Sequence, residues 1–409
     1  MPARVAPSTQ HNVTAQIERF NAGRDPERLA LKYRALRSNA YSFLRGTCHL
    51  FWAEVPASFW SSAVPLAWTC GDLHLENFGC YKSDDRQVYF DMNDFDEAAL
   101  APCSWDLIRC LSSILVGARS MSVKRPVALA LCHTFLDGYV AALANGKARW
   151  VERETAEGMV KRLLDSLHSR LRPQFLDSRT ERKGKQRLIR LDGKKALPVS
   201  EKQRNKVTAF MESFAAAQPN PQFYKVLDVA RRIAGTGSLG VERYIILVEG
   251  KGSPDRNYLL DLKQALPSSL TPHLTIKQPR WQTEAHRVVA LQQRMQAVPM
   301  AFLHPVVIGK KAYVLRGLQP SEDRVVLNGA PKEPRLLEGV IQTMGELVAW
   351  GQLRSSGRDN SAICDTLIDF AQREKWKQSL LEVAESCAAQ AEKDWRSYAA
   401  AFDDGVFTI

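Results

Sequence analysis

The spacing of apolar residues divides the chain into helical and β-rich stretches. Residues 10–55 have apolar positions at helical intervals, and Pro26 directly after Asp25 is typical of a helix start. Residues 104–145 predict two apolar helices, and residues 336–400 predict further helices. The chain therefore begins and ends in segments that we expect to be helical.

Strands are predicted between these helical segments. Val64–Thr69 and Val88–Met92 are short apolar runs separated by turn-forming residues. Residues 224–265 contain three further apolar runs, and Pro305–Leu315 alternates as a hairpin would. Thr283–Gln296 predicts one helix among these strands. Because strands and helices are segregated along the chain, we expect an α+β fold.

Charge is distributed unevenly along the chain. The 409 residues include 56 lysines and arginines against 44 acidic residues, and residues 147–206 hold 18 of these basic residues against 8 acidic ones. This segment is either a patch for nucleic acid or a solvated linker and helix face. Its few aromatic residues favour the second interpretation. Its polar, glycine-containing part, Thr180–Lys195, predicts a mobile linker.

Cysteines and apolar stretches indicate the compartment. The eight cysteines form no CxxC motif and no zinc-finger spacing, which is typical of reduced thiols in the cytosol. Met1–Leu29 lacks the apolar core of a signal peptide, and Val127–Ala144 is interrupted by His133 and Asp137. We expect a soluble, cytoplasmic protein with no membrane span. The sequence leaves its oligomeric state open.

Asp72 and Asn77 have the five-residue spacing of a phosphotransfer catalytic loop. In such a loop the aspartate orients the attacking hydroxyl, and the asparagine oxygen binds Mg²⁺. The alternative is a turn in which both side chains cap backbone groups. His74 lies between them and is a second candidate catalytic residue, with a structural hydrogen-bonding role as its alternative.

Four acidic residues, Asp91, Asp94, Asp96 and Glu97, lie within seven positions at the end of a predicted strand. Carboxylates this close repel one another unless water or a cation neutralises them. We therefore take Asp94 and Asp96 as candidate magnesium ligands, with Asp91 as an alternative second-metal or structural acid. An acidic surface turn is the other interpretation.

A glycine-rich segment lies between two predicted strands. Gly235, Gly237 and Gly240, with Ser238 among them, would let backbone amides approach the phosphates of a nucleotide, as in a kinase glycine-rich loop. No helix follows, which argues against a Rossmann turn. A plain hairpin is the alternative.

Lys263 lies in an apolar strand after the glycine-rich segment, where a kinase has its phosphate-pairing lysine. Glu284 is the only acidic residue of the next predicted helix and is the candidate ion-pair partner of Lys263. Asp106 opens an apolar helix and could hold the catalytic loop, with Arg109 on the same helix as further structural support. Arg45 is a candidate for binding phosphate or for a structural salt bridge.

These residues resemble the protein-kinase-like superfamily, in particular its aminoglycoside and choline phosphotransferase branch. The resemblance lies in the catalytic loop Gly71–Asn77, the metal turn Asp94–Glu97 and the helix start Trp105–Leu107. More closely, the chain resembles a family of uncharacterised bacterial proteins, DUF2252. The stretches similar to that family are Ser42–Gly46, Gly71–Gly79, Asn93–Glu97, Trp105–Arg109, Asp228–Gly240, Leu260–Ala265 and Arg287–Gln296.

The resemblance implies a two-lobed, kinase-like fold in a circularly permuted order, because the catalytic loop precedes the glycine-rich loop and the lysine. Residues 1–30 would form an N-terminal arm, and residues 31–210 a helical large lobe that includes the basic segment. Residues 211–335 would form a β-rich small lobe. Residues 336–409 would supply the helices that complete the large lobe.

The resulting hypothesis is a phosphotransferase that uses ATP and Mg²⁺ to modify a hydroxyl acceptor, either a small molecule or a protein side chain. Nucleotidyl transfer, and nucleotide binding without catalysis, are alternatives on the same scaffold. Nucleic-acid binding through residues 147–206 is a further and less favoured alternative.

Overall fold

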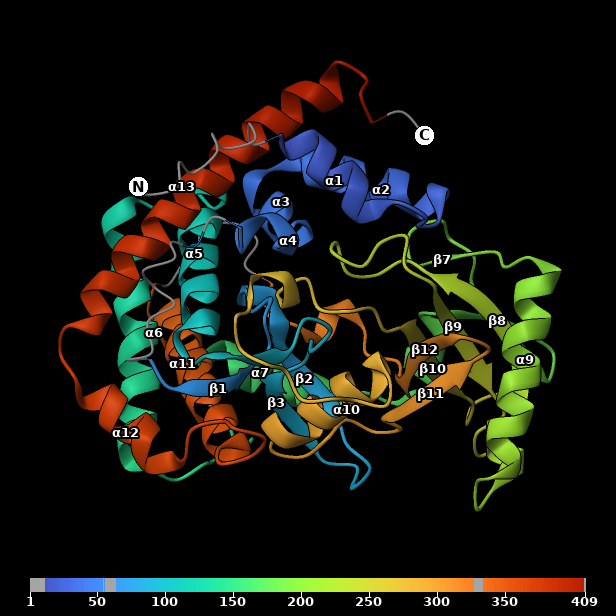
Figure 1. Cartoon of the computed structure of the whole chain (residues 1–409). Helices are drawn as coiled ribbons and strands as arrows, with labels where there is room; N and C mark the ends of the chain where they lie inside the picture. Colours follow the sequence, from blue (N-terminus) through green and yellow to red (C-terminus); the bar gives the residue numbers. More distant parts are fainter. Residues whose placement is uncertain (1–11, 54, 56–63, 327–333, 408–409) are drawn as a thin grey trace.

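A computed structural model of the chain describes residues 12–53, 55, 64–326 and 334–407. A helical part and a β-sheet part lie side by side in it (Figure 1). The fold is therefore α+β, as the sequence predicted.

The helical part is built around α5 (Ser104–Ser120), α6 (Arg125–Asn145) and α11 (Pro334–Ser355). Helix α6 packs along α11, and α5 packs against both α6 and α13 (Trp376–Asp403). Helix α5 is buried along nearly its whole length, so it forms the centre of this core. The short helix α12 (Cys364–Gln372) packs on α6.

Helix α6 is the one helix among the described residues that is long and apolar enough to cross a membrane by length and composition. A buried core helix passes the same test, and α6 packs on α5, α11 and α12. The absence of a membrane span stays a prediction.

Four N-terminal helices lie between α13 and the sheet (Figure 1). Their bounds are α1 (Val13–Asn21), α2 (Pro26–Ser38), α3 (Ala40–Gly46) and α4 (Cys48–Phe51). Helix α2 starts where the sequence predicted, because the Asp25 side chain accepts the backbone N–H of Arg28 at 3.0 Å. Helices α1, α2 and α3 pack against α13.

The sheet has six antiparallel strands in the order β11–β12–β10–β9–β8–β7. Helix α9 (Glu201–Ala216) packs against β8, and α10 (Glu284–Met295) packs against β11, β12 and α11. The strands are β7 (Ala196–Leu197), β8 (Val226–Arg232), β9 (Arg243–Val248), β10 (Tyr258–Gln264), β11 (His304–Ile308) and β12 (Lys311–Gly317).

Two small antiparallel pairs lie next to α10 and α11. Strand β1 (Leu66–Thr69) pairs with β4 (Ala99–Pro102), and β2 (Phe78–Lys82) pairs with β3 (Val88–Met92). The predicted catalytic loop connects β1 to β2, and the acidic turn connects β3 to β4. Because Phe78 lies opposite Met92 in the β2–β3 register, the loop and the turn lie together.

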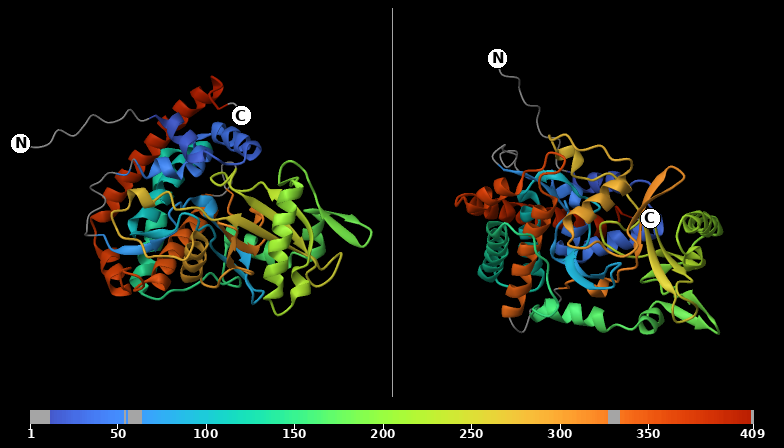
Figure 2. Two further views of the ribbon diagram at one scale, coloured as in Figure 1. Left: turned by 45° about the vertical axis from the view of Figure 1, so that its right-hand side comes forward. Right: turned by 90° about the horizontal axis from the view of Figure 1, so that it is seen from below.

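Residues 147–206 contain helices, as the helix-face interpretation expected, but Thr180–Lys195 includes a β-hairpin and not only a loop or linker. They contain helices α7 (Gly158–Ser169) and α8 (Arg172–Asp177) and the hairpin β5–β6 (Thr180–Lys183 and Gln186–Ile189) (Figure 2). Strand β7 and the first part of α9 also belong to this segment; β7 joins the sheet and α9 packs on it, although we expected both with the helical part.

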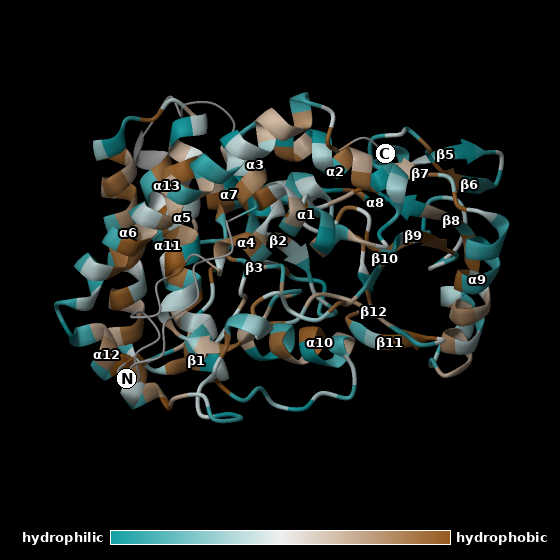
Figure 3. Cartoon of the chain, turned by 45° about the horizontal axis from the view of Figure 1, so that its top comes forward, coloured by the Kyte–Doolittle hydropathy of each residue, from teal (hydrophilic) through white to brown (hydrophobic). Residues whose placement is uncertain are grey.

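Ion pairs explain why the basic segment is ordered. Arg187 of the hairpin is 2% exposed and bonds to the carboxylates of Asp177 and Asp255 at 2.6 and 2.8 Å. The hairpin surface is hydrophilic (Figure 3), so these pairs add to the apolar contact that Ile189 of β6 makes with the sheet. Other basic residues of the segment that pair with acids are Arg153, Lys161, Arg170, Arg179, Arg182, Arg190, Lys195, Arg204 and Lys206.

One carboxylate in the middle of the sheet is surrounded by three arginines. Asp261 of β10 is fully buried, and Arg243 of β9 donates to it twice, at 2.8 and 2.6 Å. Arg232 of β8 and Arg316 of β12 lie 2.8 and 3.4 Å from the same carboxylate. Burial acts to raise the pKa of Asp261, but the arginines outweigh it and hold that pKa well below its usual range. The cluster therefore joins four strands and leaves excess positive charge in the sheet.

We predict that Asp261→Asn destabilises the protein by about 3–5 kcal/mol, because it leaves buried arginines without their counter-charge. Urea unfolding checks this value, with the exposed Asp137→Asn variant as a control that should change stability by about 0.5 kcal/mol or less. Since the pKa of Asp261 is lowered by folding, its contribution is complete above its unfolded pKa and is lost as the pH falls through the folded value. A native-like free energy of unfolding in Asp261→Asn would contradict this role.

Candidate functional site

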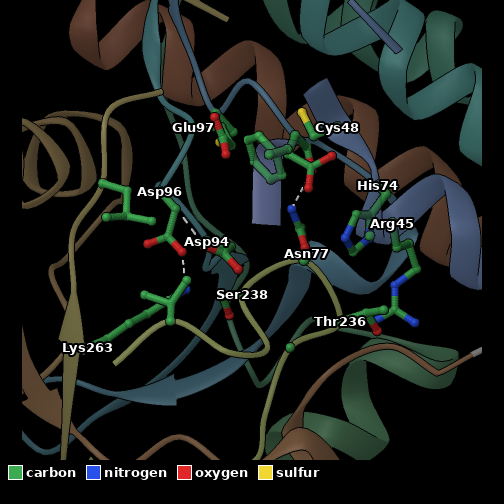
Figure 4. A pocket seen from close by; sticks show the side chains of 18 of the residues that line it. Arg45, Cys48, His74, Asn77, Asp94, Asp96, Glu97, Thr236, Ser238 and Lys263 are labelled. Atoms are coloured by element: carbon green, nitrogen blue, oxygen red, sulfur yellow. Dashed lines mark hydrogen bonds and ion pairs between the residues drawn. The ribbon is translucent and has the colours of Figure 1, made fainter. Parts of the chain in front are cut away.

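A cavity of about 270 Å³ lies where the helical part meets the sheet. Its volume is close to the lower end of the range for small-ligand pockets, about 300 Å³. It brings together segments from Phe20 to Arg324, about three hundred residues apart in the sequence. The sequence-predicted residues in its lining are Arg45, Asp72, His74, Asn77, Asp94, Asp96, Gly235, Gly237, Ser238 and Lys263 (Figure 4).

Asp106 holds the start of the catalytic loop, as expected. Its carboxylate accepts the backbone N–H groups of Cys70 and Gly71 at 2.7 and 2.9 Å. Gly71 has φ +79°, and a Cβ there would lie 2.2 Å from the carbonyl oxygen of Glu97. Only glycine fits this position without a shift of the backbone. The loop and the acidic turn are therefore in direct contact at Gly71.

Asp72 faces the cavity and is paired from behind by Arg109. The Arg109 side chain is fully buried and donates to Oδ1 of Asp72 from Nε and Nη2 at 2.9 and 2.7 Å. Burial raises the pKa of Asp72, and the charge of Arg109 opposes that shift only in part. Asp72 is thus oriented, with one oxygen engaged, and is a stronger base than an exposed aspartate.

Asn77 and Asp94 present oxygen atoms to the same region (Figure 4). The Nδ2 group of Asn77 donates to the backbone oxygen of Asp72 at 2.6 Å, which leaves Oδ1 as the free acceptor. Burial acts to raise the pKa of Asp94, but the positive charges of Lys263, Arg324 and other arginines outweigh it and lower the pKa to about 2. Asp94 is therefore ionised at neutral pH.

The oxygens of Asn77 and Asp94 supply only part of the ligand shell of a hard cation such as Mg²⁺. No group of three or more His, Cys, Asp or Glu side chains within the described ranges could hold a metal ion. Mg²⁺ is commonly held by one or two protein oxygens, with water and substrate phosphates completing its shell. Asn77 and Asp94 would suit Mg²⁺ that arrives with phosphate, and not a metal site that is complete in the protein alone.

Lys263 pairs with Asp96 and not with Glu284. The Lys263 side chain is 6% exposed, and its ammonium forms an ion pair with the carboxylate of Asp96 (Figure 4). Glu284 lies outside the cavity lining and bonds to Arg287 at 2.6 Å. The expected Lys263–Glu284 pair is therefore replaced, because the acidic turn supplies a nearer carboxylate.

Arg287 is the residue of α10 that contacts the site. It donates to the backbone oxygens of Asp96, Ala98 and Leu266, at 2.7, 2.6 and 3.0 Å. These bonds tie the acidic turn to the segment that follows Lys263. Arg287 opens one of the stretches that resemble the DUF2252 family, which was the only sequence signal for it.

The glycine-rich segment covers one side of the cavity. Gly235 has φ +74°, a left-handed conformation that favours glycine. Gly240 does not line the cavity, in contrast to the expectation that it binds nucleotide. A Cβ at Gly240 would lie 2.8 Å from Cβ of Arg24, so this glycine allows the N-terminal segment to approach.

The N-terminal segment holds the glycine-rich loop. Arg24 and Lys32 each donate to the backbone oxygen of Gly237 at 2.9 Å. The backbone N–H of Asp25 donates to the oxygen of Gly240, also at 2.9 Å. Lys32 is fully buried. The expected N-terminal arm is therefore part of the site, although no pattern in the sequence indicated these long-range bonds.

His74 and Arg45 are connected through Glu76, whereas Asp91 lies apart from them. Nδ1 of His74 accepts the backbone N–H of Glu76 at 3.2 Å, and Arg45 forms an ion pair with the Glu76 carboxylate at 2.7 Å. Asp91 is buried outside the cavity lining, 3.3 Å from Arg354. Of the two alternatives for Asp91, the structural one fits this position.

We predict that Asp106→Asn loosens the catalytic loop while the chain stays folded. The amide offers one acceptor oxygen and places its NH₂ group against a backbone N–H, at a cost of about 1–3 kcal/mol. Hydrogen exchange should become faster at Cys70 and Gly71 and stay unchanged in α13. Unchanged exchange at these two amides would remove Asp106 from this role, and Asp137→Asn provides the matched control.

Comparison with known proteins gives a family. The model of a family described as "Uncharacterized protein conserved in bacteria (DUF2252)" matches residues 24–401. No curated protein and no solved structure matches the chain. The matched range includes both loops of the cavity, the acidic turn and the lysine strand. The chain therefore belongs to the DUF2252 family of uncharacterised bacterial proteins.

Proposed function

We propose that this protein is an ATP- and Mg²⁺-dependent phosphotransferase with a permuted kinase-like arrangement. The observation that carries the proposal is that cationic and acidic side chains line one cavity. Cationic side chains line it together with the glycine-rich loop, and acidic side chains line it from the catalytic loop and the acidic turn. The cations are Arg24, Arg45, Lys263 and Arg324, and the acids are Asp72, Asp94, Asp96 and Glu97.

This charge pattern suits a magnesium–polyphosphate ligand. The phosphate oxygens would bind to the cations and to the backbone amides of the glycine-rich loop. Asn77 and Asp94 would hold Mg²⁺, which neutralises charge on the transferring phosphate when it is bound. Asp72 would orient the acceptor hydroxyl and accept its proton, a role that its raised pKa supports.

The order of the elements supports a kinase-like arrangement. Strand β8, the glycine-rich loop, β9, the lysine strand β10 and helix α10 follow one another, as in the phosphate-covering part of a protein kinase. The catalytic loop and the acidic turn come from an earlier part of the chain, which is the permuted order. In place of the kinase lysine–glutamate pair, Lys263 would exchange Asp96 for the phosphates of the nucleotide.

We predict that the protein binds ATP only with Mg²⁺, and that Lys263→Ala and Asp94→Asn each weaken this binding about tenfold or more. Isothermal titration calorimetry measures both effects. Lys311→Ala on the neighbouring strand and Asp137→Asn are the matched controls, and neither should change the affinity.

Catalysis is tested with a panel of hydroxyl acceptors. Asp72→Ala should abolish transfer but keep the affinity for ATP, and mass spectrometry should find one added phosphate on the acceptor. A gain of one nucleoside monophosphate would instead establish nucleotidyl transfer. Folded wild-type protein that binds no nucleotide would overturn the proposal.

The pH dependence of transfer should report Asp72. Because the aspartate acts in its ionised form, kcat/KM should rise with pH through a pKa above the ordinary value of about 3.9. Arg109→Met removes the charge that opposes the shift, so the rise should move upward by about 1 pH unit or more. A pH profile that is identical in wild type and Arg109→Met would show that Asp72 is not the titrating group.

A further inference from the structure

Three side chains that can donate hydrogen bonds converge on one end of the cavity. Each of them has at least one N–H group with no acceptor among the described residues. They come from separate segments: Arg45 from the end of α3, His74 from the catalytic loop and Arg324 from the segment after β12. Figure 4 shows Arg45 and His74 next to each other, on the far side of Asn77 from Lys263.

Arg324 is the least satisfied of the three. Its Nε atom is buried without a hydrogen-bond partner, and its guanidinium forms no ion pair with any other described residue. A buried donor without an acceptor is unfavourable, because it has lost its hydrogen bonds to water. Nε of Arg45 is also buried without a partner, although the same side chain pairs with Glu76. The two arginines repel each other, so their proximity is itself unfavourable.

His74 is a neutral donor that faces the same space. Burial lowers its pKa well below the usual range, and the charges of Arg45, Arg109 and Arg324 lower it further. Since Nδ1 accepts the N–H of Glu76, the proton of the neutral ring lies on Nε2. Within the part of the chain that the structure describes, Nε2 has no hydrogen-bond partner.

We propose that Arg45, His74 and Arg324 form a subsite that binds a phosphate group. Arginine guanidinium groups match the oxygens of phosphate and donate several parallel hydrogen bonds. A doubly charged phosphate suits this region better than a singly charged carboxylate, because Arg243 and Arg316 add to the positive potential at Arg324. The subsite gives the unpaired N–H groups their acceptors and removes the repulsion between the arginines.

Two sources could supply this phosphate, and the choice between them rests on the proposed function. It is either the terminal phosphate of the nucleotide or a phosphate ester on the acceptor. In the first case the subsite positions the transferring group beside Asp72. In the second case it selects acceptors that are already phosphorylated.

The test begins with inorganic phosphate titrated calorimetrically into the full-length protein. Arg324→Gln and Arg45→Gln should each weaken phosphate binding about tenfold or more. The exposed Arg125→Gln should leave phosphate binding unchanged, and circular dichroism checks that all variants are folded. Arg324→Lys should fall between wild type and Arg324→Gln, because lysine keeps the charge but loses the planar fork. Equal phosphate affinity in wild type and both glutamine variants would overturn the subsite.

A second arm compares ATP with ADP, both with Mg²⁺. If the subsite holds the terminal phosphate, Arg324→Gln weakens ATP binding but not ADP binding. If it holds an acceptor phosphate, both nucleotides bind to Arg324→Gln as to wild type, and inorganic phosphate still binds to the ATP complex of the wild type. Wild-type protein that binds phosphate but no nucleotide would support the subsite and overturn the proposed function. If the wild type binds nucleotide and the variants keep their phosphate affinity, the proposed function is supported and the subsite is overturned.

Discussion

Buried charge must be balanced, and in this protein the balance is made between segments that are far apart in the chain. Lys263 of the sheet meets Asp96 of the acidic turn, and Arg109 of α5 meets Asp72 of the catalytic loop. Arg287 of α10 donates to backbone oxygens of the acidic turn. Because an unpaired buried charge is costly, these contacts hold the catalytic loop, the acidic turn and the lysine strand together around the cavity.

The charges that pair with one another in the cavity lining are those that a ligand would use. A ligand carrying both a cation and phosphates offers new partners to the acids and to the cations at once. Binding would then exchange pairs and not break them, which keeps its electrostatic cost low. A ligand with one sign of charge would leave half of the lining unpaired. The two signs of charge in the lining therefore support the proposed metal–phosphate complex over either component alone.

The sequence predicted the features whose signals are local. The helix start at Pro26, the strand Val88–Met92 and the helix capped by Thr283 are all confirmed, since each depends on neighbouring residues. Asp72 and Asn77 both line the cavity, as their short spacing allows, and their catalytic roles stay a prediction. DUF2252 membership is also confirmed.

The sequence did not reveal the long-range partners. Glu284 was chosen as the only acid on its helix, but the partner of Lys263 comes from a turn 167 residues away. The order of the β5–β6 hairpin likewise depends on Asp255, far along the chain.

The bonds that hold the glycine-rich loop also fix the direction of its amide groups. A trans peptide is planar, so its N–H points away from its C=O. Arg24 and Lys32 draw the oxygen of Gly237 toward the N-terminal helices, and Lys32 lies outside the cavity lining. The N–H of Ser238 belongs to the same peptide and must point the opposite way. Two cations thereby fix the direction of a hydrogen-bond donor in the glycine-rich loop before any anion arrives. The backbone entropy of that orientation is lost when the protein folds and not when it binds.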